Sequence, residues 1–260
     1  MKVTVCQLST EEDKFDNHWQ QLVKYTNQHK SDFVLLPEMP FYPWICSLQA
    51  VDVQLWQNAV ESHKLWNQKL PELGVDLVIG TRPTIHSESN KRYNKGYIWS
   101  ADFGIQDLHE KVYLPNEEGF WEAKWYDRGK KSFQVFSFGG IIIGFLICTE
   151  LWFMEHAREY AKQGIHFLVC PRATPSETVD KWIVGGRAAA VISGAFCLSS
   201  NHQGMALDDR TIFGGVGWII DPEGNVLEKT DDQNPFKTLE IDIDIAERAK
   251  STYPRYVIEY

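Results

Sequence analysis

Three polar residues stand at the ends of apolar, strand-like runs, and their side chains are of the kinds that carry acyl transfer. Glu38 follows FVLLP, Lys111 closes IQDLHEK, and Cys148 closes IIIGFLIC. A residue at the end of a buried strand is held by a rigid scaffold, so its side chain can be placed with the accuracy that catalysis needs. We therefore take these three residues as the candidate chemical groups of the chain.

A thiol becomes a strong nucleophile only after it loses its proton, so Cys148 needs a neighbouring base or positive charge. Glu38 could accept that proton. Lys111, with the backbone N–H of Thr149, could stabilise the oxyanion that forms when the thiolate attacks a carbonyl carbon. Position alone also allows plainer interpretations, in which Glu38 caps a helix, Lys111 is a solvated charge and Cys148 is buried apolar filler.

The elements that would position these residues alternate between continuous apolar strands and amphipathic helices. This alternation is typical of an α/β fold, and the hairpins indicate a core of two sheets with helices outside. No repeat, linker or low-complexity tract divides the chain, so we expect one domain over residues 1–260. We expect helices at 13–29, 48–70, 153–163 and 178–193, a hairpin at 214–230, and strands at 2–8, 32–38, 75–81, 93–101, 105–113, 132–137, 139–148, 165–171, 195–201 and 237–243.

Composition and charge exclude several classes of protein. With 260 residues, 43% of them hydrophobic and 23% charged, the chain can bury a full core and does not have the composition of a disordered protein. The net charge of −9 argues against a nucleic-acid partner, which requires a basic face. No apolar stretch approaches the ~20 residues of a membrane span. The N-terminus, MKVTVCQLST, lacks the apolar core of a signal peptide, so we expect no membrane partner and a cytoplasmic location.

The five cysteines are odd in number, and no two of them have a CxxC or CxxxC spacing. A disulfide framework and a structural zinc site are therefore both disfavoured, and we expect no metal. Cys6, Cys170 and Cys197 lie within apolar runs, where cysteine behaves as a small hydrophobic side chain. Cys46 lies in the loop PWICSL beyond Glu38 and could line the same pocket.

Three stretches, in this order, resemble the nitrilase superfamily of carbon–nitrogen hydrolases: LLPEMPFYPW, HEKVYLPNEEGFWEAKWYDRG and IIIGFLICTELWFMEHAREYAKQGIHFLVCPRAT. The resemblance spans nearly the whole chain and includes GRAAAVISGAFCLSSNHQG and the DPEGNVL hairpin. It implies a four-layer α-β-β-α sandwich and a Glu–Lys–Cys triad at Glu38, Lys111 and Cys148. It also implies cleavage of a non-peptide C–N bond through a thioester acyl-enzyme, without a metal or organic cofactor.

The resemblance further implies a second active-site glutamate after the lysine segment, and three residues compete for that place. GFWEAKWYDRG is similar to a family stretch in which a glutamate stands seven residues before a glycine, which favours Glu122. A Glu–Gly–aromatic order, used in amidase-like members, would favour Glu118. Glu117 is the third candidate.

Two departures from the family pattern bear on the substrate. The lysine is often preceded by Arg, whereas Glu110 stands there in this chain. Many members have Tyr-Asp and then an Arg for a substrate carboxylate after the cysteine, whereas this chain has Thr149, Glu150, Leu151 and Trp152. Arg172 is the remaining candidate for holding an anionic group, and it could equally form a salt bridge at a strand end.

The segments that flank the triad predict a pocket with aromatic walls, which suits a compact apolar or cationic group. Glu110, Glu117, Glu118 and Glu150 would add negative charge nearby. We therefore expect a small neutral or cationic amide or N-carbamoyl amine as the substrate, in preference to an N-carbamoyl amino acid. The expected wall residues are Phe41, Tyr42, Trp44, Phe120, Trp121 and Trp152, although these aromatics could merely pack the edge of the sandwich.

Other functions remain open at this point. A cysteine peptidase would pair its cysteine with a histidine, but no histidine stands in a recognisable context. A nitrile-hydrolysing nitrilase and a catalytically silent binding or scaffold protein are both compatible with the resemblance. Family members generally self-associate, so we expect a dimer or a larger assembly that uses segments 44–66, 121–125 and 251–260.

Overall fold

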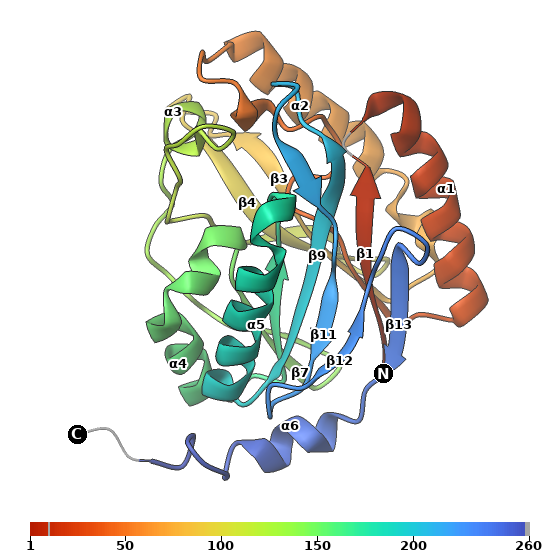
Figure 1. The fold of residues 1–260 in the computed structure, drawn as a ribbon, viewed down its shortest axis with the longest axis vertical. Helices are drawn as coiled ribbons and strands as arrows, with labels where there is room; N and C mark the ends of the chain where they lie inside the picture. Colours follow the sequence, from red (N-terminus) through yellow and green to blue (C-terminus); the bar gives the residue numbers. More distant parts are fainter. Residues whose placement is uncertain (10, 258–260) are drawn as a thin grey trace.

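The computed structural model describes residues 1–9 and 11–257, and strand β1 (Lys2–Ser9) lies at its centre (Figure 1). Along its first half β1 pairs in parallel with β2 and antiparallel with β13. Along its second half, from Gln7 to Ser9, it pairs in parallel with β9. The resulting strand order is β5-β4-β3-β2-β1-β9-β8-β7-β6. One strand therefore joins two sheets: β2 to β5 with β13 on one side, and β6 to β12 on the other.

The elements follow one another in an alternating order, as the sequence predicts. The strands are β1, β2 (Phe33–Leu35), β3 (Leu77–Ile85), β4 (Arg92–Ser100), β5 (Gly104–Glu110), β6 (Phe136–Phe138), β7 (Ile141–Phe145), β8 (Phe167–Pro171), β9 (Phe196–Met205), β10 (Ile212–Gly214), β11 (Trp218–Ile220), β12 (Val226–Lys229) and β13 (Phe236–Glu240). The α-helices are α1 (Glu12–His29), α2 (Val53–Asn67), α3 (Glu122–Trp125), α4 (Met154–Lys162), α5 (Val179–Ser193) and α6 (Ile243–Ala249). Short 3₁₀-helices are η1 (Ile45–Ser47), η2 (Leu70–Leu73), η3 (Cys148–Trp152) and η4 (Ser176–Thr178).

Alternate residues of β1 face two different cores, because successive side chains of a strand point to opposite faces. Val3 and Val5 pack between the two sheets, in a cluster that contains Phe167 of β8. Cys6 and Leu8 pack in a second cluster, beneath α1. The outer face of the second sheet is covered by α4 and α5 (Figure 1).

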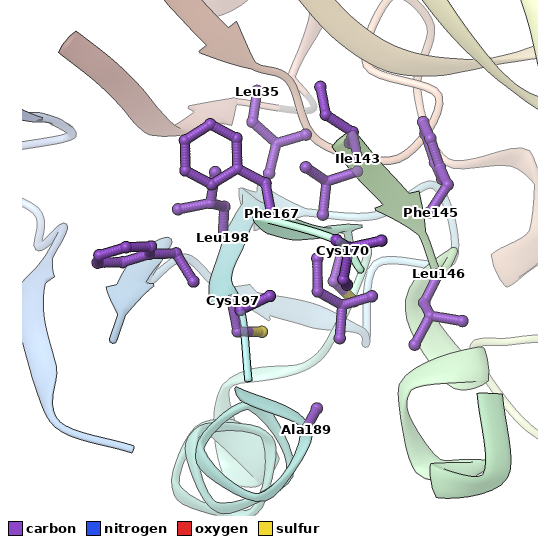
Figure 2. Packing of buried hydrophobic residues seen from close by; sticks show 14 of the residues in the cluster. Leu35, Ile143, Phe145, Leu146, Phe167, Cys170, Ala189, Cys197 and Leu198 are labelled. Carbon is purple, nitrogen blue, oxygen red and sulfur yellow. The ribbon is translucent and has the colours of Figure 1, made fainter. Parts of the chain in front are cut away.

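Figure 2 shows the inner core, with Leu35 of the first sheet above Phe167 and Leu198 of the second, and Ala189 of α5 on the far side. The layers are thus helix, sheet, sheet and helix. The predicted α/β class and four-layer sandwich are confirmed. The assignment of one domain to the whole range 1–260 stays a prediction.

Several predicted boundaries are wrong, and two of the errors concern the candidate site. Strand β7 ends at Phe145, so Cys148 opens η3 and is not the last residue of a strand. Strand β5 ends at Glu110, one residue before Lys111. Both residues therefore lie just beyond their strands, although the N–H of Lys111 still donates to the carbonyl of Asn94 in β4.

Other differences have local causes. The helix expected at 48–70 is shortened to α2 because Asp52 caps it by accepting a hydrogen bond from the N–H of Gln54. Of the strand expected at 132–137, only Phe136 and Ser137 pair with a neighbour, and β6 continues to Phe138. Elements α3, β10 and α6 were not predicted. Within the described part of the chain, no helix combines the length and apolar content that a bilayer crossing requires.

Candidate active site

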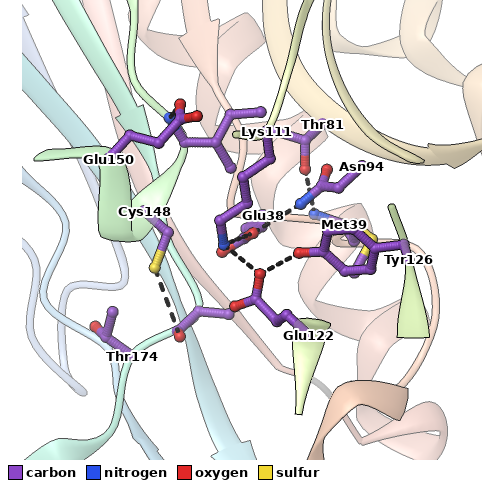
Figure 3. Close-up of polar contacts among 12 residues, drawn as sticks. Glu38, Met39, Thr81, Asn94, Lys111, Glu122, Tyr126, Cys148, Glu150 and Thr174 are labelled. Carbon is purple, nitrogen blue, oxygen red and sulfur yellow. Dashed lines mark hydrogen bonds and ion pairs between the residues drawn. The ribbon is translucent and has the colours of Figure 1, made fainter. Parts of the chain in front are cut away.

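Four chain segments converge on one buried cluster of polar side chains (Figure 3). Glu38 follows β2, Lys111 follows β5, Glu122 opens α3 and Cys148 opens η3. These side chains belong to residues that are between 0% and 3% exposed. Residues separated by more than 100 positions along the sequence thus share one small volume from which bulk water is excluded.

The ammonium of Lys111 lies between two carboxylates. Its Nζ is 2.7 Å from Oε1 of Glu38 and 2.5 Å from Oε2 of Glu122. Burial by itself would lower the pKa of Lys111, but Glu122 and Glu38 together raise that pKa well above its usual range. Lys111 is therefore a permanent cation here, and one of the three N–H bonds of its ammonium remains for another acceptor.

Glu38 uses its two carboxylate oxygens differently. Oε1 accepts hydrogen bonds from Lys111 Nζ and from Asn94 Nδ2, each at 2.7 Å. Oε2 is buried and has no hydrogen-bond partner among the described residues. Burial, opposed by Lys111, raises the pKa of Glu38 to about 7, and an interaction with the Cys148 thiol lowers it in part. A carboxylate with a pKa near neutrality and an unused oxygen is suited to take up and return a proton.

The backbone of Glu38 is anchored on both sides. The N–H of Glu38 donates to the carbonyl of Arg172 at 3.2 Å, and the N–H of Met39 donates to Oγ1 of Thr81 at 2.7 Å. The imidazole Nε2 of His202 contacts the carbonyl oxygen of Glu38 at 2.5 Å. These bonds fix the backbone from which the Glu38 side chain extends, and Asn94 and Lys111 hold the carboxylate itself.

Cys148 has an unusual backbone conformation and a buried thiol. Its φ of +49° lies in the left-handed region, which a residue with a side chain adopts only when its surroundings impose it. Because Cys148 and Thr149 begin η3, their N–H groups have no acceptor within that helix. Burial and Glu38 raise the pKa of the thiol well above its usual range. The resting thiol is thus neutral and depends on a base.

The cluster opens into a cavity of about 480 Å³. Apolar and aromatic side chains form most of its wall, and the charged residues among its lining are Glu117, Glu122 and Lys181. The lining residues are Pro115, Asn116, Glu117, Phe120, Glu122, Cys148, Thr149, Trp152, Ala173, Thr174, Pro175, Thr178, Lys181 and Trp182. The cavity therefore gives a small molecule access to the sulfur from a largely apolar chamber.

A model of the carbon–nitrogen hydrolase family matches residues 2–253 of the chain. The chain belongs to the carbon–nitrogen hydrolase family. It is 26% identical to a citrullinase of Francisella tularensis over 89% of this chain and 85% of that protein. It is 24% identical to an N-carbamoylputrescine amidase of Arabidopsis thaliana over 83% of this chain and 76% of that protein.

The fold agrees with that of solved carbon–nitrogen hydrolases. A crystal structure from Helicobacter pylori superimposes with a TM-score of 0.87 at 20% identity, covering 98% of this chain and 94% of that one. An amidase of Nesterenkonia sp. gives a TM-score of 0.78 at 17% identity, covering 95% of this chain and 92% of that one.

The expectation that Arg172 could hold an anionic substrate is wrong for this hydrolase. Arg172 is wholly buried, and its guanidinium donates to Ser199 Oγ, Thr174 Oγ1 and the carbonyl of Val216, each at 2.7 Å. The guanidinium also stacks on Trp218, 3.9 Å from the ring centre. Burial lowers the pKa of Arg172 to about 10. Arg172 is therefore part of the scaffold that holds Thr174 at the cavity wall.

The predicted aromatic wall is only partly present in the hydrolase cavity. Phe120, Thr149 and Trp152 line it. Phe41 and Tyr42 line a separate cavity beside Trp66. Trp44 is buried against Phe120 and Phe213, and Trp121 lines a third cavity with Glu118 and Arg210. Trp182 of α5 takes part instead, with its ring centre 5.0 Å from that of Trp152.

The three candidates for the second glutamate lie in different surroundings. Glu122 contacts Lys111 and accepts a further short hydrogen bond from the hydroxyl of Tyr126. Glu118 is exposed and pairs with Arg210 at 2.7 Å. Glu117 is exposed and lines the cavity. The structure therefore brings Glu122 to the lysine and separates Glu118 from it.

The expected surplus of negative charge around the hydrolase cavity is smaller than the sequence indicated. Glu110 pairs with Lys95 at 3.1 Å. Glu150 is buried and contacts His109 at 2.7 Å. Of the four glutamates expected nearby, Glu117 lines the cavity. Lys181 also lines it and introduces a positive charge that the sequence analysis did not anticipate.

Sequence reasoning also missed Asn94 and Tyr126, which hold Glu38 and Glu122. Asn94 had one usable signal, since it is an amide within the strand-like run RYNKGYIWS. Tyr126 stands one turn after Glu122, a spacing that places two side chains on the same side of a helix. Without the fold, neither signal says which carboxylate would be the partner.

Proposed function

We propose that this carbon–nitrogen hydrolase cleaves a small amide or N-carbamoyl amine through a thioester on Cys148. The observation that carries the proposal is the Lys111 ammonium held between Glu38 and Glu122 at 2.7 and 2.5 Å, in a cluster that shares its cavity with the Cys148 thiol. This arrangement combines a base, a fixed cation and a nucleophile in a dry site, where electrostatic effects are strong.

In the first half of the reaction, Oε2 of Glu38 takes the proton of the Cys148 thiol as the sulfur attacks the carbonyl carbon. The free N–H of the Lys111 ammonium and the backbone N–H of Thr149 donate to the resulting oxyanion. Glu38 then returns the proton to the nitrogen of the leaving group as the C–N bond breaks. Ammonia or an amine departs and leaves a thioester.

In the second half, Glu38 takes a proton from water as the water oxygen attacks the thioester carbon. The C–S bond breaks, the proton passes to the sulfur, and the acid leaves. Glu122 has no proton to transfer in this scheme. Its contacts with Lys111 and Tyr126 keep the ammonium in place during both halves.

Relatives with named activities support this reaction class. They include a citrullinase, N-carbamoylputrescine amidases and ω-amidases. In a structure of a mutant of the amidase from Nesterenkonia sp. AN1, the acetamide moiety of fluoroacetamide is covalently added to the active-site cysteine. We extend the covalent role of that cysteine to Cys148 as part of the proposal.

Ammonia release from a panel of simple amides, N-carbamoyl amines and nitriles tests the proposal. The wild-type protein should release ammonia from amides or carbamoyl compounds, and Cys148→Ser should lose at least about 10³-fold in kcat/KM. Release from nitriles alone would favour a nitrilase. No release from any compound by protein that is folded would favour a silent binding or scaffold protein.

The residues at the cavity wall define two candidate classes of substrate. Glu117 and the Trp152–Trp182 pair favour an amide or N-carbamoyl amine with a cationic or neutral tail, as the sequence predicts. Lys181 favours a second candidate, an amide whose tail also carries a carboxylate. Glu117→Gln should weaken cationic substrates selectively, and Lys181→Gln should weaken anionic ones. If Lys181→Gln alone lowers kcat/KM for the best substrate, the prediction of a neutral or cationic tail is wrong.

Three further expectations stay predictions: a dimer or larger assembly, a cytoplasmic location, and a reaction without metal or organic cofactor. The tail expected at the interface, 251–260, includes residues 258–260, which lie outside the described residues. Light scattering at micromolar concentration tests the assembly, because a monomer would have a mass of 30.0 kDa.

A further inference from the structure

One carboxylate outside the Glu–Lys–Cys cluster touches the chain on both sides of it. Glu150 is fully buried, two residues after Cys148. Its Oε1 accepts from the N–H of Val112 at 2.7 Å, and its Oε2 accepts from the N–H of Ile147 at 2.8 Å. Oε2 also contacts Nε2 of His109 at 2.7 Å. Glu150 is drawn beside the cluster in Figure 3.

The positions of these partners relate Glu150 to the chemistry. Val112 directly follows Lys111, and Ile147 directly precedes Cys148. His109 stands two residues before Lys111 on the same segment. A single buried side chain therefore joins the segment that carries the lysine to the segment that carries the thiol.

We propose that Glu150, held by His109, is a positioning residue that fixes the Lys111 ammonium relative to the Cys148 sulfur. This inference rests on the proposed function, because it assigns Glu150 a part in the same reaction. Glu150 does not touch the reacting atoms in this scheme. It acts through the two backbone N–H groups that flank the lysine and the cysteine.

The donors around Glu150 explain why a carboxylate is required there. Three N–H groups converge on its two oxygens, and a carboxylate can accept all three because it has no donor of its own. A glutamine at this position would turn one of its N–H bonds toward another N–H, so at least one buried donor would lose its partner. The amide would keep the shape of the side chain, but it could no longer accept from Val112, Ile147 and His109 at the same time.

His109 is the ion-pair partner of Glu150. Its Nδ1 contacts the carbonyl of Ser132 at 3.3 Å, so both ring nitrogens face acceptors. Burial lowers the pKa of His109, but Glu150 more than offsets this effect and the pKa is raised. A ring that donates from both nitrogens carries a positive charge, which offsets the cost of keeping the Glu150 carboxylate away from water.

The left-handed backbone at Cys148 explains why the bond between Glu150 and the Ile147 N–H matters. A residue with φ of +49° persists only where its neighbours leave it no alternative, and the bond from the Ile147 N–H to Glu150 fixes the Leu146–Ile147 peptide, one residue before Cys148. If that bond is lost, the thiol can move relative to Lys111. A displacement of ~1 Å between reacting groups costs about 100-fold in rate.

The test compares Glu150→Gln and His109→Gln with wild type and with a control, Thr26→Val. Thr26 donates a buried hydrogen bond from α1 to the carbonyl of Leu73 in η2, and neither element lines the cavity. Thermal unfolding, kcat and KM for the best amide, and the rate at which iodoacetamide alkylates Cys148 are measured for each protein. The alkylation rate does not require turnover, so it tests the positioning even if no amide is a substrate.

We expect Glu150→Gln to lower kcat by about 10–100-fold with KM changed less than about threefold, and to slow Cys148 alkylation at least about fivefold. His109→Gln should act in the same direction. Thr26→Val should lower the unfolding temperature with kcat and alkylation within about twofold of wild type. The inference is overturned if both test variants keep wild-type kcat and alkylation, or if Thr26→Val reproduces their losses. If Glu150→Gln does not fold, the kcat and the alkylation rate of His109→Gln decide whether the inference holds. Failure of the proposed function looks different, since wild type itself would then release no ammonia.

Discussion

Asn94 Nδ2 lies 2.7 Å from Oε1 of Glu38, the oxygen that Lys111 also contacts. The carbonyl of Asn94 meanwhile accepts from the backbone N–H of Lys111 at 2.9 Å. One residue of β4 therefore holds the proposed base by its side chain and the proposed cation by its backbone. Because both donors bind Oε1, Oε2 is left for the proton of the thiol.

Replacing Asn94 with Ala should lower kcat/KM about tenfold, because Oε1 of Glu38 loses one of two buried donors and the carboxylate can rotate. Steady-state kinetics on the best amide measure the effect. Asn58→Ala is the matched control, since Asn58 is exposed on α2 and its side chain accepts a hydrogen bond from Gln54 at 3.0 Å, away from the cluster. Equal kinetics for the two variants would show that Asn94 does not orient the base.

The rate should depend on the protonation of Glu38. Its pKa is raised to about 7, chiefly by burial, and the base must be ionised to accept the thiol proton. Since a carboxyl loses its proton as pH rises, kcat/KM should increase from pH 6 to pH 8, with its midpoint near 7. A pH profile of kcat/KM checks this, because that quantity reports the free enzyme. A rate that falls over this interval would contradict the assignment of Glu38 as base.

Glu122 and Glu118 form a matched pair for mutation. Glu122→Gln should lower kcat at least about 100-fold, because the amide would present Lys111 with a weaker acceptor and would disturb the bond from Tyr126. Glu118→Gln should stay within about twofold of wild type, since exposed ion pairs contribute little. The kcat values of both variants, measured under the same conditions, decide which glutamate supports Lys111. A larger loss for Glu118→Gln would reverse the assignment.

Cys148 should be the first cysteine to react with iodoacetamide in the native protein. It lines the cavity beside a base, whereas Cys6, Cys46, Cys170 and Cys197 are fully buried. Burial raises the pKa of all five thiols, so the difference lies in access to the cavity and in Glu38, which can take the proton of Cys148. Peptide mapping after brief labelling measures the order. Labelling of Cys46 before Cys148 would mean that the loop after Glu38 opens to the reagent.

The sequence alone determined the fold class and provided the candidate site residues. Continuous apolar runs and helical periodicity are local signals, so β1, α1, β8 and α5 could be predicted within a few residues. Glu38, Lys111 and Cys148 were singled out because each follows such a run and because the three stretches resemble one family. Boundaries next to the site failed, since the strands end at Glu110 and Phe145 and the apolar runs continue beyond them.

Only the tertiary structure decided which polar groups meet. Asn94 and Glu38 are 56 positions apart, and Glu150 and His109 are 41 apart. Their contacts depend on strand register and loop paths, which no local pattern encodes. The same reason explains the errors at Arg172, Trp44 and Trp121. A charged or aromatic residue near a motif can face the cavity or the scaffold, and the packing of the two sheets selects one face for each.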